Sequence, residues 1–176
     1  MKPQHNENMR DILGKIAISA HVITPDFKGK QRISRLIQRA IGTTTQKSKE
    51  GILLATRLTS SSDLSFLREG GHSLIRSEVQ KLQEGQVFLD IGANVGYFSL
   101  LASQAVGRSG AVIAIEPSQR ELEILLKNIC QNKAKNISVV SIATSQTNEL
   151  ADLYIEPEHA GLNKISRADT GSVHQR

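Results

Sequence analysis

A glycine-containing loop between an apolar run and a helical pattern constrains the fold of this chain more than any other feature of the sequence. The run Val87–Ile91 is short and rich in Val, Phe and Ile, which is typical of a buried β-strand. The loop Asp90–Gly96 ends this run, and the apolar spacing of Val95–Val106 then predicts a helix. A strand that leads through a tight loop into a helix is the first part of a βαβ unit.

The same alternation continues along the chain. Ala111–Ile115 predicts a second buried strand, and Ser118 with Glu121 forms the S-x-x-E pattern of a helix N-terminus. The apolar face expected for this helix consists of Leu122, Leu125, Leu126 and Ile129. Asn136–Ile142 then predicts a third strand. Strand, helix, strand, helix, strand at these spacings makes a parallel sheet with right-handed crossovers, so we expect an open α/β fold.

The loop after the first of these strands is the expected ligand site. Open parallel sheets bind ligands beyond the carboxyl ends of their strands. Gly92 and Gly96 let the backbone approach a ligand closely, and the free N–H groups of the following helix favour an acceptor there. Glu116 ends the second strand, where a carboxylate can accept both hydroxyl groups of a ribose. The two features together predict a nucleoside-containing ligand.

The spacing of the glycines indicates which nucleoside is bound. A dinucleotide site has the pattern G-x-G-x-x-G, whose outer glycines are five residues apart, whereas Gly92 and Gly96 are four apart. Asp90 would repel a pyrophosphate but suits a ligand with an ammonium or sulfonium cation. An NAD-dependent oxidoreductase is therefore the least favoured of the hypotheses that we keep.

Two long segments carry a resemblance to a known family. Residues 88–101 read FLDIGANVGYFSLL and residues 110–117 read GAVIAIEP. At this spacing they resemble the FkbM-type family of S-adenosylmethionine-dependent methyltransferases, over about residues 70–166. The resemblance implies a class I methyltransferase core, which is an open parallel-sheet, Rossmann-like α/β fold, and it implies S-adenosylmethionine as the cofactor.

The resemblance also implies roles for individual residues. Asp90 would reach the ammonium group of the cofactor, Glu116 would hold the ribose hydroxyls, and Pro117 would pack beside the adenine. The full set of cofactor-binding residues that it implies is Asp90, Gly92, Ala93, Asn94, Gly96, Tyr97, Glu116 and Pro117. Within this set, Asn94 is also a candidate cap of the helix.

The activity implied by the family is methyl transfer to an oxygen of a small hydroxyl-bearing metabolite or sugar. A complete methyltransferase sheet has seven strands, yet only 34 residues follow Ile142, with Leu150–Ile155 as the one further strand candidate. We therefore expect a C-terminally truncated sheet, assign no catalytic residue, and expect self-association through an unpaired strand edge. A non-catalytic cofactor-binding or interaction module is the alternative, and whether the chain is an enzyme stays open.

The N-terminal part, residues 1–69, is expected to be a helical and basic extension of the partial methyltransferase domain at 70–176. A weak helix is expected near Met9–Ala20, and a stripe of Ile and Leu predicts an amphipathic helix around Ile33–Ile41. The segment Lys28–Arg39 holds five basic residues and no acid. We favour a helix that docks its stripe on the core; contact with an anionic surface is the alternative.

Composition excludes several further classes. Aromatic residues make up only 3% of the chain and Trp is absent, which disfavours a nucleic-acid partner. Cys130 is the sole cysteine, so no internal disulfide is possible, a zinc site is not expected, and the residue is expected to pack in the protein. No apolar run is long enough for a signal peptide or a transmembrane helix, and we expect a cytoplasmic protein.

Overall fold

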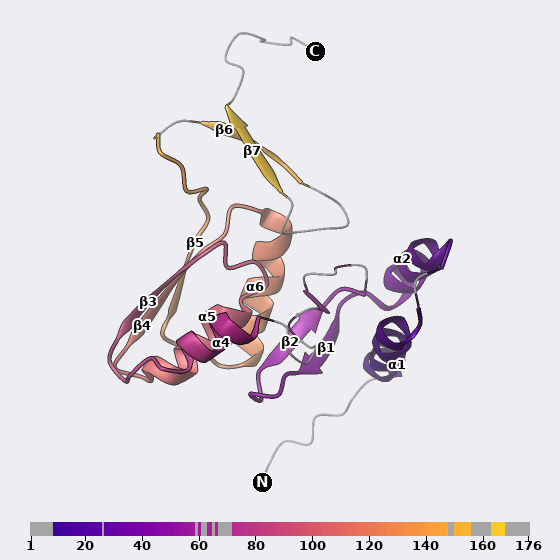
Figure 1. Ribbon diagram of the computed structural model, residues 1–176, viewed down its shortest axis with the longest axis horizontal. Helices are drawn as coiled ribbons and strands as arrows, with labels where there is room; N and C mark the ends of the chain where they lie inside the picture. Colours follow the sequence, from indigo (N-terminus) through magenta and orange to yellow (C-terminus); the bar gives the residue numbers. More distant parts are fainter. Residues whose placement is uncertain are drawn as a thin grey trace.

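The fold is built on a parallel sheet with helices on one side (Figure 1). The computed structural model describes residues 9–25, 27–58, 60, 63–64, 66, 72–147, 150–155 and 163–167. Along the chain, helices α1 and α2 and the strands β1 and β2 precede this sheet, and a second small hairpin, β6 and β7, follows it.

The central sheet contains strands β3 (Val87–Ile91), β4 (Ala111–Ile115) and β5 (Ile137–Val140), all parallel and in the order β3-β4-β5. Helix α5 (Tyr97–Val106) connects β3 to β4, and α6 (Gln119–Gln131) connects β4 to β5. The open α/β fold expected from the sequence is therefore confirmed, with element boundaries within a few residues of the expected ones.

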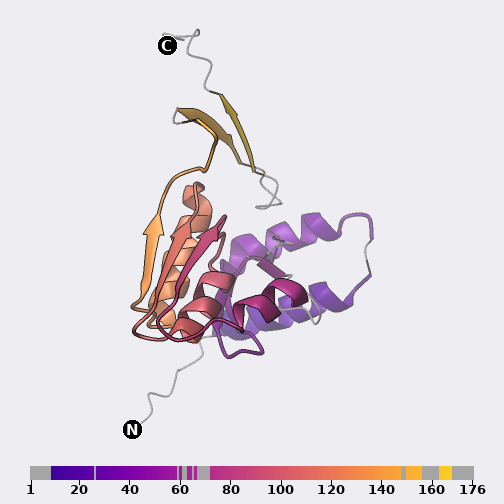
Figure 2. The same ribbon diagram turned by 60° about the vertical axis from the view of Figure 1, so that its left-hand side comes forward.

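Only one face of this sheet is covered within the part of the chain that the structure describes. Because both right-handed crossovers step in the same direction, α5 and α6 lie on the same face (Figure 2). On the other face, Val87, Leu89 and Ile91 of β3 are 67%, 53% and 58% exposed. The expectation that β3 is a buried strand was wrong for this face, because nothing in the described residues packs against it.

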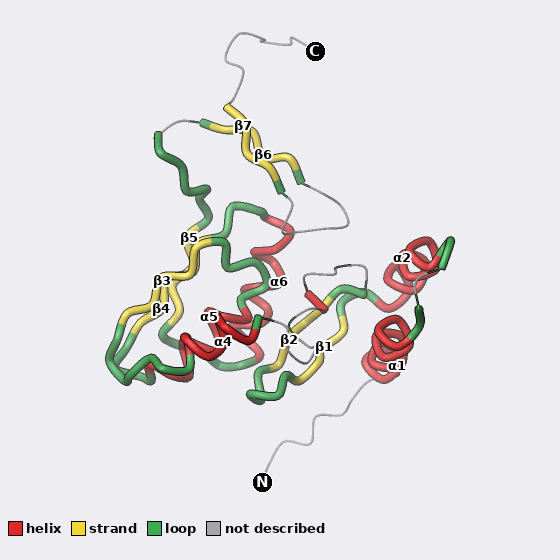
Figure 3. Tube along the Cα trace, in the orientation of Figure 1, coloured by secondary structure: helices red, strands yellow, loops and turns green. Residues whose placement is uncertain are grey.

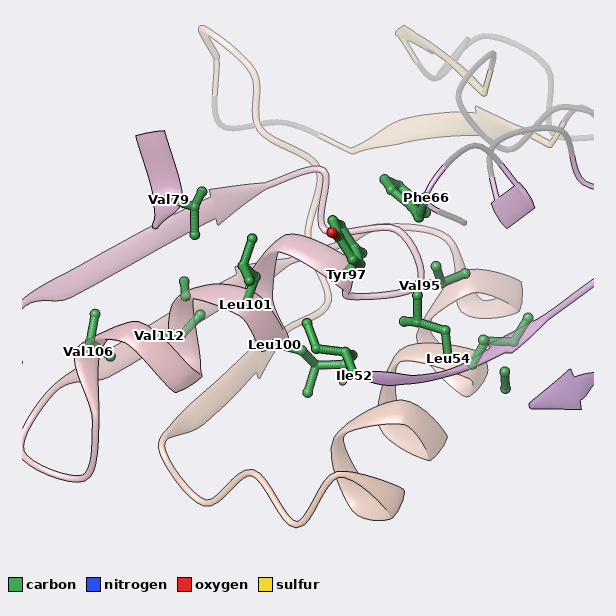
Figure 4. Packing of buried hydrophobic residues seen from close by; sticks show 13 residues of the cluster. Ile52, Leu54, Phe66, Val79, Val95, Tyr97, Leu100, Leu101, Val106 and Val112 are labelled. Carbon is green, nitrogen blue, oxygen red and sulfur yellow. The ribbon is translucent and has the colours of Figure 1, made fainter. Parts of the chain in front are cut away.

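The largest core cluster lies between the covered face and the N-terminal part of the chain. It joins Val112 of β4, Leu100 and Leu101 of α5, and Ile52 and Leu54 next to and within β2. Figure 4 shows these side chains converging on α5, and their burial fixes the helix on the sheet. A smaller cluster seats α6 through Leu125 against Ala93 and Ala114.

Two expectations about packing on α6 were wrong. Leu126 is 54% exposed and Cys130 is exposed, so neither is a core residue. The buried side of this helix instead carries Leu125 and Asn128, because part of it faces the edge of a strand rather than an apolar surface.

That strand belongs to a hairpin in the N-terminal extension. Strands β1 (Thr44–Lys47) and β2 (Leu53–Thr56) pair antiparallel, so the extension is not purely helical as expected. The free edge of β2 docks on amide side chains of α6 and of its C-cap residue. Asn132 Oδ1, at the cap, accepts the N–H of Leu53 (2.9 Å), and Asn128 Oδ1 accepts that of Ala55 (2.7 Å). Side-chain amides thus take the place of a neighbouring strand.

The remaining elements are small. Helix α4 (Ser73–Val79) precedes the sheet, while β6 (Ala151–Tyr154) and β7 (Lys164–Arg167) pair antiparallel with each other. Leu150–Ile155 is thus confirmed as a strand region, but it forms a separate hairpin beyond the carboxyl end of β5 rather than a fourth strand of the sheet (Figure 3). The proposed domain boundary at residue 69 falls outside the described residues.

Candidate functional site

The expected ligand loop lies at the carboxyl ends of β3 and β4. It folds over the end of β4, because the amides of Gly92 and Ala93 both donate to the carbonyl oxygen of Ile115 at 2.9 Å. The amide of Gly96 closes the turn on Ala93 at 2.8 Å. These three N–H groups are therefore satisfied within the protein, so their amides stabilise the loop and any contact with the methionine part of a cofactor must come from other groups there.

Glu116 joins the ends of the two strands through its carboxylate. Its Oε2 accepts the amide N–H of Asn94 (2.8 Å), and its Oε1 accepts that of Ser118 (2.9 Å). The residue is 6% exposed, and burial raises the pKa of its carboxyl group, opposed by these two amide hydrogen bonds. An ionised carboxylate has about four acceptor positions, so each oxygen retains capacity for one more donor, such as a ribose hydroxyl.

The two glycines of the loop have different surroundings although both have positive φ angles. At Gly92, with φ 79°, an added Cβ would meet nothing within 4 Å, so its α-carbon borders open space. At Gly96, with φ 86°, an added Cβ would overlap Cδ1 of Leu125. Gly92 therefore suits close approach of a ligand, whereas Gly96 is required for packing of the loop on α6.

Asn94 combines a positive φ angle with a buried side-chain acceptor. It is a non-glycine residue at φ 51°, a conformation that asparagine tolerates better than most residues. Its amide is held by Glu116, but its Oδ1 is buried and has no hydrogen-bond partner among the described residues. The helix cap considered for Asn94 is not formed, because Gly96 is the N-cap of α5 and receives no side-chain hydrogen bond.

Asp90 lies on the helix-covered face of β3. Ser99 Oγ donates to its Oδ2 at 2.5 Å. Burial raises the pKa of the Asp90 carboxyl group, and hydrogen bonds from the hydroxyl and amide of Ser99 oppose that rise. The carboxylate thus accepts hydrogen bonds from the N-terminal turn of α5. Its direct contact with the ammonium group of a cofactor remains a prediction.

Tyr97 is placed in the core rather than at the edge of the loop. Its ring stacks on Phe66 with centroids 5.0 Å apart, and it is fully buried (Figure 4). Its hydroxyl donates to Glu50 Oε2 at 3.0 Å, and Arg76 lies over the ring. Burial, followed by the bond to Glu50, raises the pKa of Tyr97 to about 12. A cofactor role for Tyr97 stays a prediction; Pro117, beside Glu116, is partly exposed.

Sequence patterns did not predict a buried ionic network that joins Arg57 and Asp63 to Glu121, at the start of α6. Arg57 donates to both carboxylate oxygens of Asp63 (2.9 and 3.0 Å) and to Glu121 (2.9 Å), and Asp63 and Glu121 are almost completely buried. Ser118 Oγ also donates to Glu121, so the expected S-x-x-E pair makes a side-chain contact instead of a full capping box. The network ties the N-terminal extension to the start of α6 beside the site.

Asn128 provides a second link that sequence spacing does not reveal. It is fully buried, and its Nδ2 donates to the carbonyl oxygen of Val95 in the loop at 2.7 Å. Its Oδ1 accepts the amide of Ala55 in β2. One side chain thus connects the N-terminal hairpin to the ligand loop.

Two cavities lined by described residues lie away from this loop. The larger of the two, about 690 Å³, lies at the amino ends of β4 and β5, at the opposite end of the strands from the loop. It is lined by Gly107, Arg108 and residues 132–136. Another, about 500 Å³, lies between Glu50 and α5.

Comparison with known proteins relates this region to methyltransferases. Residues 72–146 match the family model of protein-L-isoaspartate(D-aspartate) O-methyltransferase. A probable cobalt-precorrin-6B C(15)-methyltransferase (decarboxylating) of Sulfolobus acidocaldarius is 28% identical over 85 residues, 44% of this chain and 44% of that protein. The matched region is related to class I S-adenosylmethionine-dependent methyltransferases.

Other similar proteins include a 23S rRNA (uracil(1939)-C(5))-methyltransferase of Acinetobacter baylyi, 33% identical over 64 residues, 36% of this chain and 14% of that protein. Among solved structures, a SAM-dependent methyltransferase from Aquifex aeolicus is 26% identical with a TM-score of 0.37, over 53% of this chain and 46% of that chain. The chain spans less than half the length of these proteins.

The methyltransferase relationship agrees with the class of fold and with the cofactor expected from the sequence. It does not confirm the narrower resemblance to the FkbM-type family, because the matching family model is a different one.

Proposed function

We propose that this chain binds S-adenosylmethionine at the Asp90–Gly96 loop and belongs to an enzyme that transfers the methyl group to a hydroxyl oxygen of a small metabolite or sugar. The observation that carries the proposal is the arrangement of acceptors around Asn94. Its backbone amide donates to Glu116, while its Oδ1 is buried and no described residue donates a hydrogen bond to it. A buried acceptor without a donor is costly, so it suits a site that a donor-bearing ligand completes.

The residues present fit this cofactor. Gly92 borders open space where a Cβ would obstruct a ligand. Glu116 and Asn94 offer acceptors for the ribose hydroxyls and the ammonium group, both of which are donors. The loop lies where the crossovers of the sheet place a ligand site, at the carboxyl ends of β3 and β4.

In the proposed reaction the cofactor supplies an activated methyl group on a sulfonium sulfur. The contribution of this chain is positioning. Glu116 is fixed by two amide hydrogen bonds, so its carboxylate does not reorganise when ribose hydroxyls bind, and Asn128 holds the loop through Val95.

The resemblance to the FkbM-type family and the O-methyltransferase family model support oxygen as the methyl acceptor. The precorrin and rRNA enzymes among the relatives are named as C-methyltransferases, so carbon is the competing acceptor. S-adenosylhomocysteine release with hydroxylated small molecules, compared with reactions lacking an acceptor, tests for turnover. The position of the new methyl group in the product, read by nuclear magnetic resonance, decides between oxygen and carbon: a methyl bonded to oxygen supports the proposal, and a methyl bonded only to carbon would refute it.

Titration calorimetry with Asn94→Gly tests the binding site. Glycine keeps the positive φ and the amide bond to Glu116 but removes the unpaired Oδ1, so folding should be unchanged while S-adenosylmethionine affinity falls about 10- to 100-fold, as for one hydrogen bond to a charged ligand. Lys133→Gly is the matched control, because Lys133 also has positive φ (55°) and lies on the turn after α6. Equal affinity of both variants would refute the role of Asn94, and tight NAD binding alone would refute the cofactor.

A non-catalytic module is the second candidate. It is favoured by the apolar face of β3, which no described element covers and which could pack against another protein. S-adenosylmethionine binding without turnover on any acceptor would support this candidate over the enzyme.

A further inference from the structure

We propose that helices α1 (Met9–Ile23) and α2 (Lys30–Ile41) form a docking surface for an anionic membrane, with apolar side chains inserting between lipid headgroups and arginines contacting lipid phosphates. This inference is independent of the proposed methyl transfer. The surface lies at the end of the molecule opposite the central sheet (Figures 1 and 2).

The two helices contact each other, and both pack on Leu58 through one side. His21 of α1 and Ser34 of α2 are hydrogen-bonded at 2.8 Å. Ile18 and Ile37 pack with Leu58 in a small cluster. The inward sides of both helices are thus packed, and no described residue packs on their outward sides.

The outward sides are apolar to an unusual degree. Large apolar side chains that are 40–69% exposed recur on α1, on the connecting turn and on α2: Met9, Ile12, Leu13, Ile16, Phe27, Ile33 and Leu36. The expectation that the stripe of α2 docks on the core is therefore only partly met. Ile37 is inward, but Ile33 and Leu36 face solvent, because the packed side of the helix is rotated away from the centre of its stripe.

Basic residues form a row beside the exposed apolar row on α2. Ile33, Leu36 and Ala40 follow the spacing i, i+3, i+7, and so do Arg32, Arg35 and Arg39. All six residues are exposed. Each row lies along one side of the helix, and the two rows are adjacent. This combination is characteristic of helices that lie in the interface of an anionic membrane.

Charge and composition favour a membrane over other occupants. A second copy of this chain would bring the same patch against itself, so the cations of Lys28–Arg39 would face each other. RNA would engage the arginines but would leave Ile33 and Leu36 without an apolar partner, and aromatic platforms for bases are scarce. No described helix is long and apolar enough to cross a bilayer, so the contact we propose is peripheral.

Vesicle flotation of the full chain tests the proposal. Binding is expected to phosphatidylcholine vesicles that contain phosphatidylserine, and to be much weaker without it. Arg32→Gln/Arg39→Gln should weaken vesicle binding about 30-fold, because each basic residue strengthens binding to an anionic surface about five-fold. Arg108→Gln/Lys135→Gln is the control. It removes the same charge from exposed positions near the amino ends of β4 and β5 and should leave vesicle binding unchanged.

A second variant separates insertion from plain electrostatics. Ile33→Ser/Leu36→Ser alters only exposed side chains and should weaken vesicle binding while S-adenosylmethionine affinity stays unchanged. Equal loss in both arginine and control variants would overturn the proposal. Two other results would also overturn it. One is a labelled RNA that binds the wild type more tightly than the vesicles do and binds the serine variant equally well. The other is self-association of the wild type that the serine variant abolishes, with no binding to vesicles.

Discussion

Alanine substitution at the two loop glycines separates their roles. Both residues have positive φ, so alanine at either one incurs about 1–2 kcal/mol of backbone strain. Gly92→Ala meets no further obstacle, whereas Gly96→Ala also forces its Cβ into Leu125, and such overpacking costs about 1–3 kcal/mol more. The free energy of unfolding should therefore fall by about 1–2 kcal/mol for Gly92→Ala and about 2–5 kcal/mol for Gly96→Ala.

A double-mutant cycle with Leu125→Ala tests the origin of the difference. Leu125→Ala alone removes a fully buried side chain and should cost about 2–5 kcal/mol. In that background the Cβ at position 96 has room, so Gly96→Ala should cost only the backbone strain, about 1–2 kcal/mol. Gly92→Ala should be additive with Leu125→Ala.

Urea unfolding followed by far-ultraviolet circular dichroism gives the free energies of unfolding of wild type, the three single variants and the two double variants. Zero coupling between positions 96 and 125, or equal losses for the two glycine variants, would refute the packing argument. Calorimetry on the same proteins gives the complementary result: Gly92→Ala should lose S-adenosylmethionine affinity while its fold persists.

Further predictions concern buried groups and the bare sheet face. Alkaline titration of Tyr154→Phe, which leaves Tyr97 as the sole tyrosine, should show tyrosinate absorbance with a midpoint of about 12, and a midpoint near 10 would rule out the buried bond to Glu50. Asn128→Leu should cost about 2–6 kcal/mol in urea unfolding, because two buried backbone groups lose their partner; a loss below 1 kcal/mol would contradict this. Burial alone would raise the pKa of Glu121, but hydrogen bonds from Ser118 and two arginines lower it below 4.5. The ionised carboxylate therefore stabilises the fold above that pH, and this stabilisation is lost as the pH falls through the folded pKa. Glu121→Gln should accordingly lose less unfolding free energy on acidification than wild type. Leu89→Thr should reduce concentration-dependent association in analytical ultracentrifugation. Unchanged association would exclude the exposed apolar face of β3 as the surface through which the chain associates.

Local patterns in the sequence determined the central fold and the place of the ligand loop. The apolar runs of β3 and β4 are contiguous, and the glycines and Glu116 stand at fixed distances from them. Such features depend on residues close in the chain, so periodicity and turn chemistry are enough to find them. The loop could therefore be located, and its class of ligand narrowed, before any tertiary contact was known.

Only the tertiary structure decided what each side chain of the loop does. Gly92 and Gly96 are alike in sequence and in φ, yet one borders open space and the other Leu125, which lies 29 residues further along. Asn128 holds the loop and β2 together across 33 and 73 residues. Long-range packing of this kind leaves no periodic trace in the sequence, because it depends on which surfaces meet after folding. The exposure of the apolar rows on α1 and α2 has the same origin: the sequence determines that a stripe exists, and only the packing of the helices decides how much of it remains uncovered.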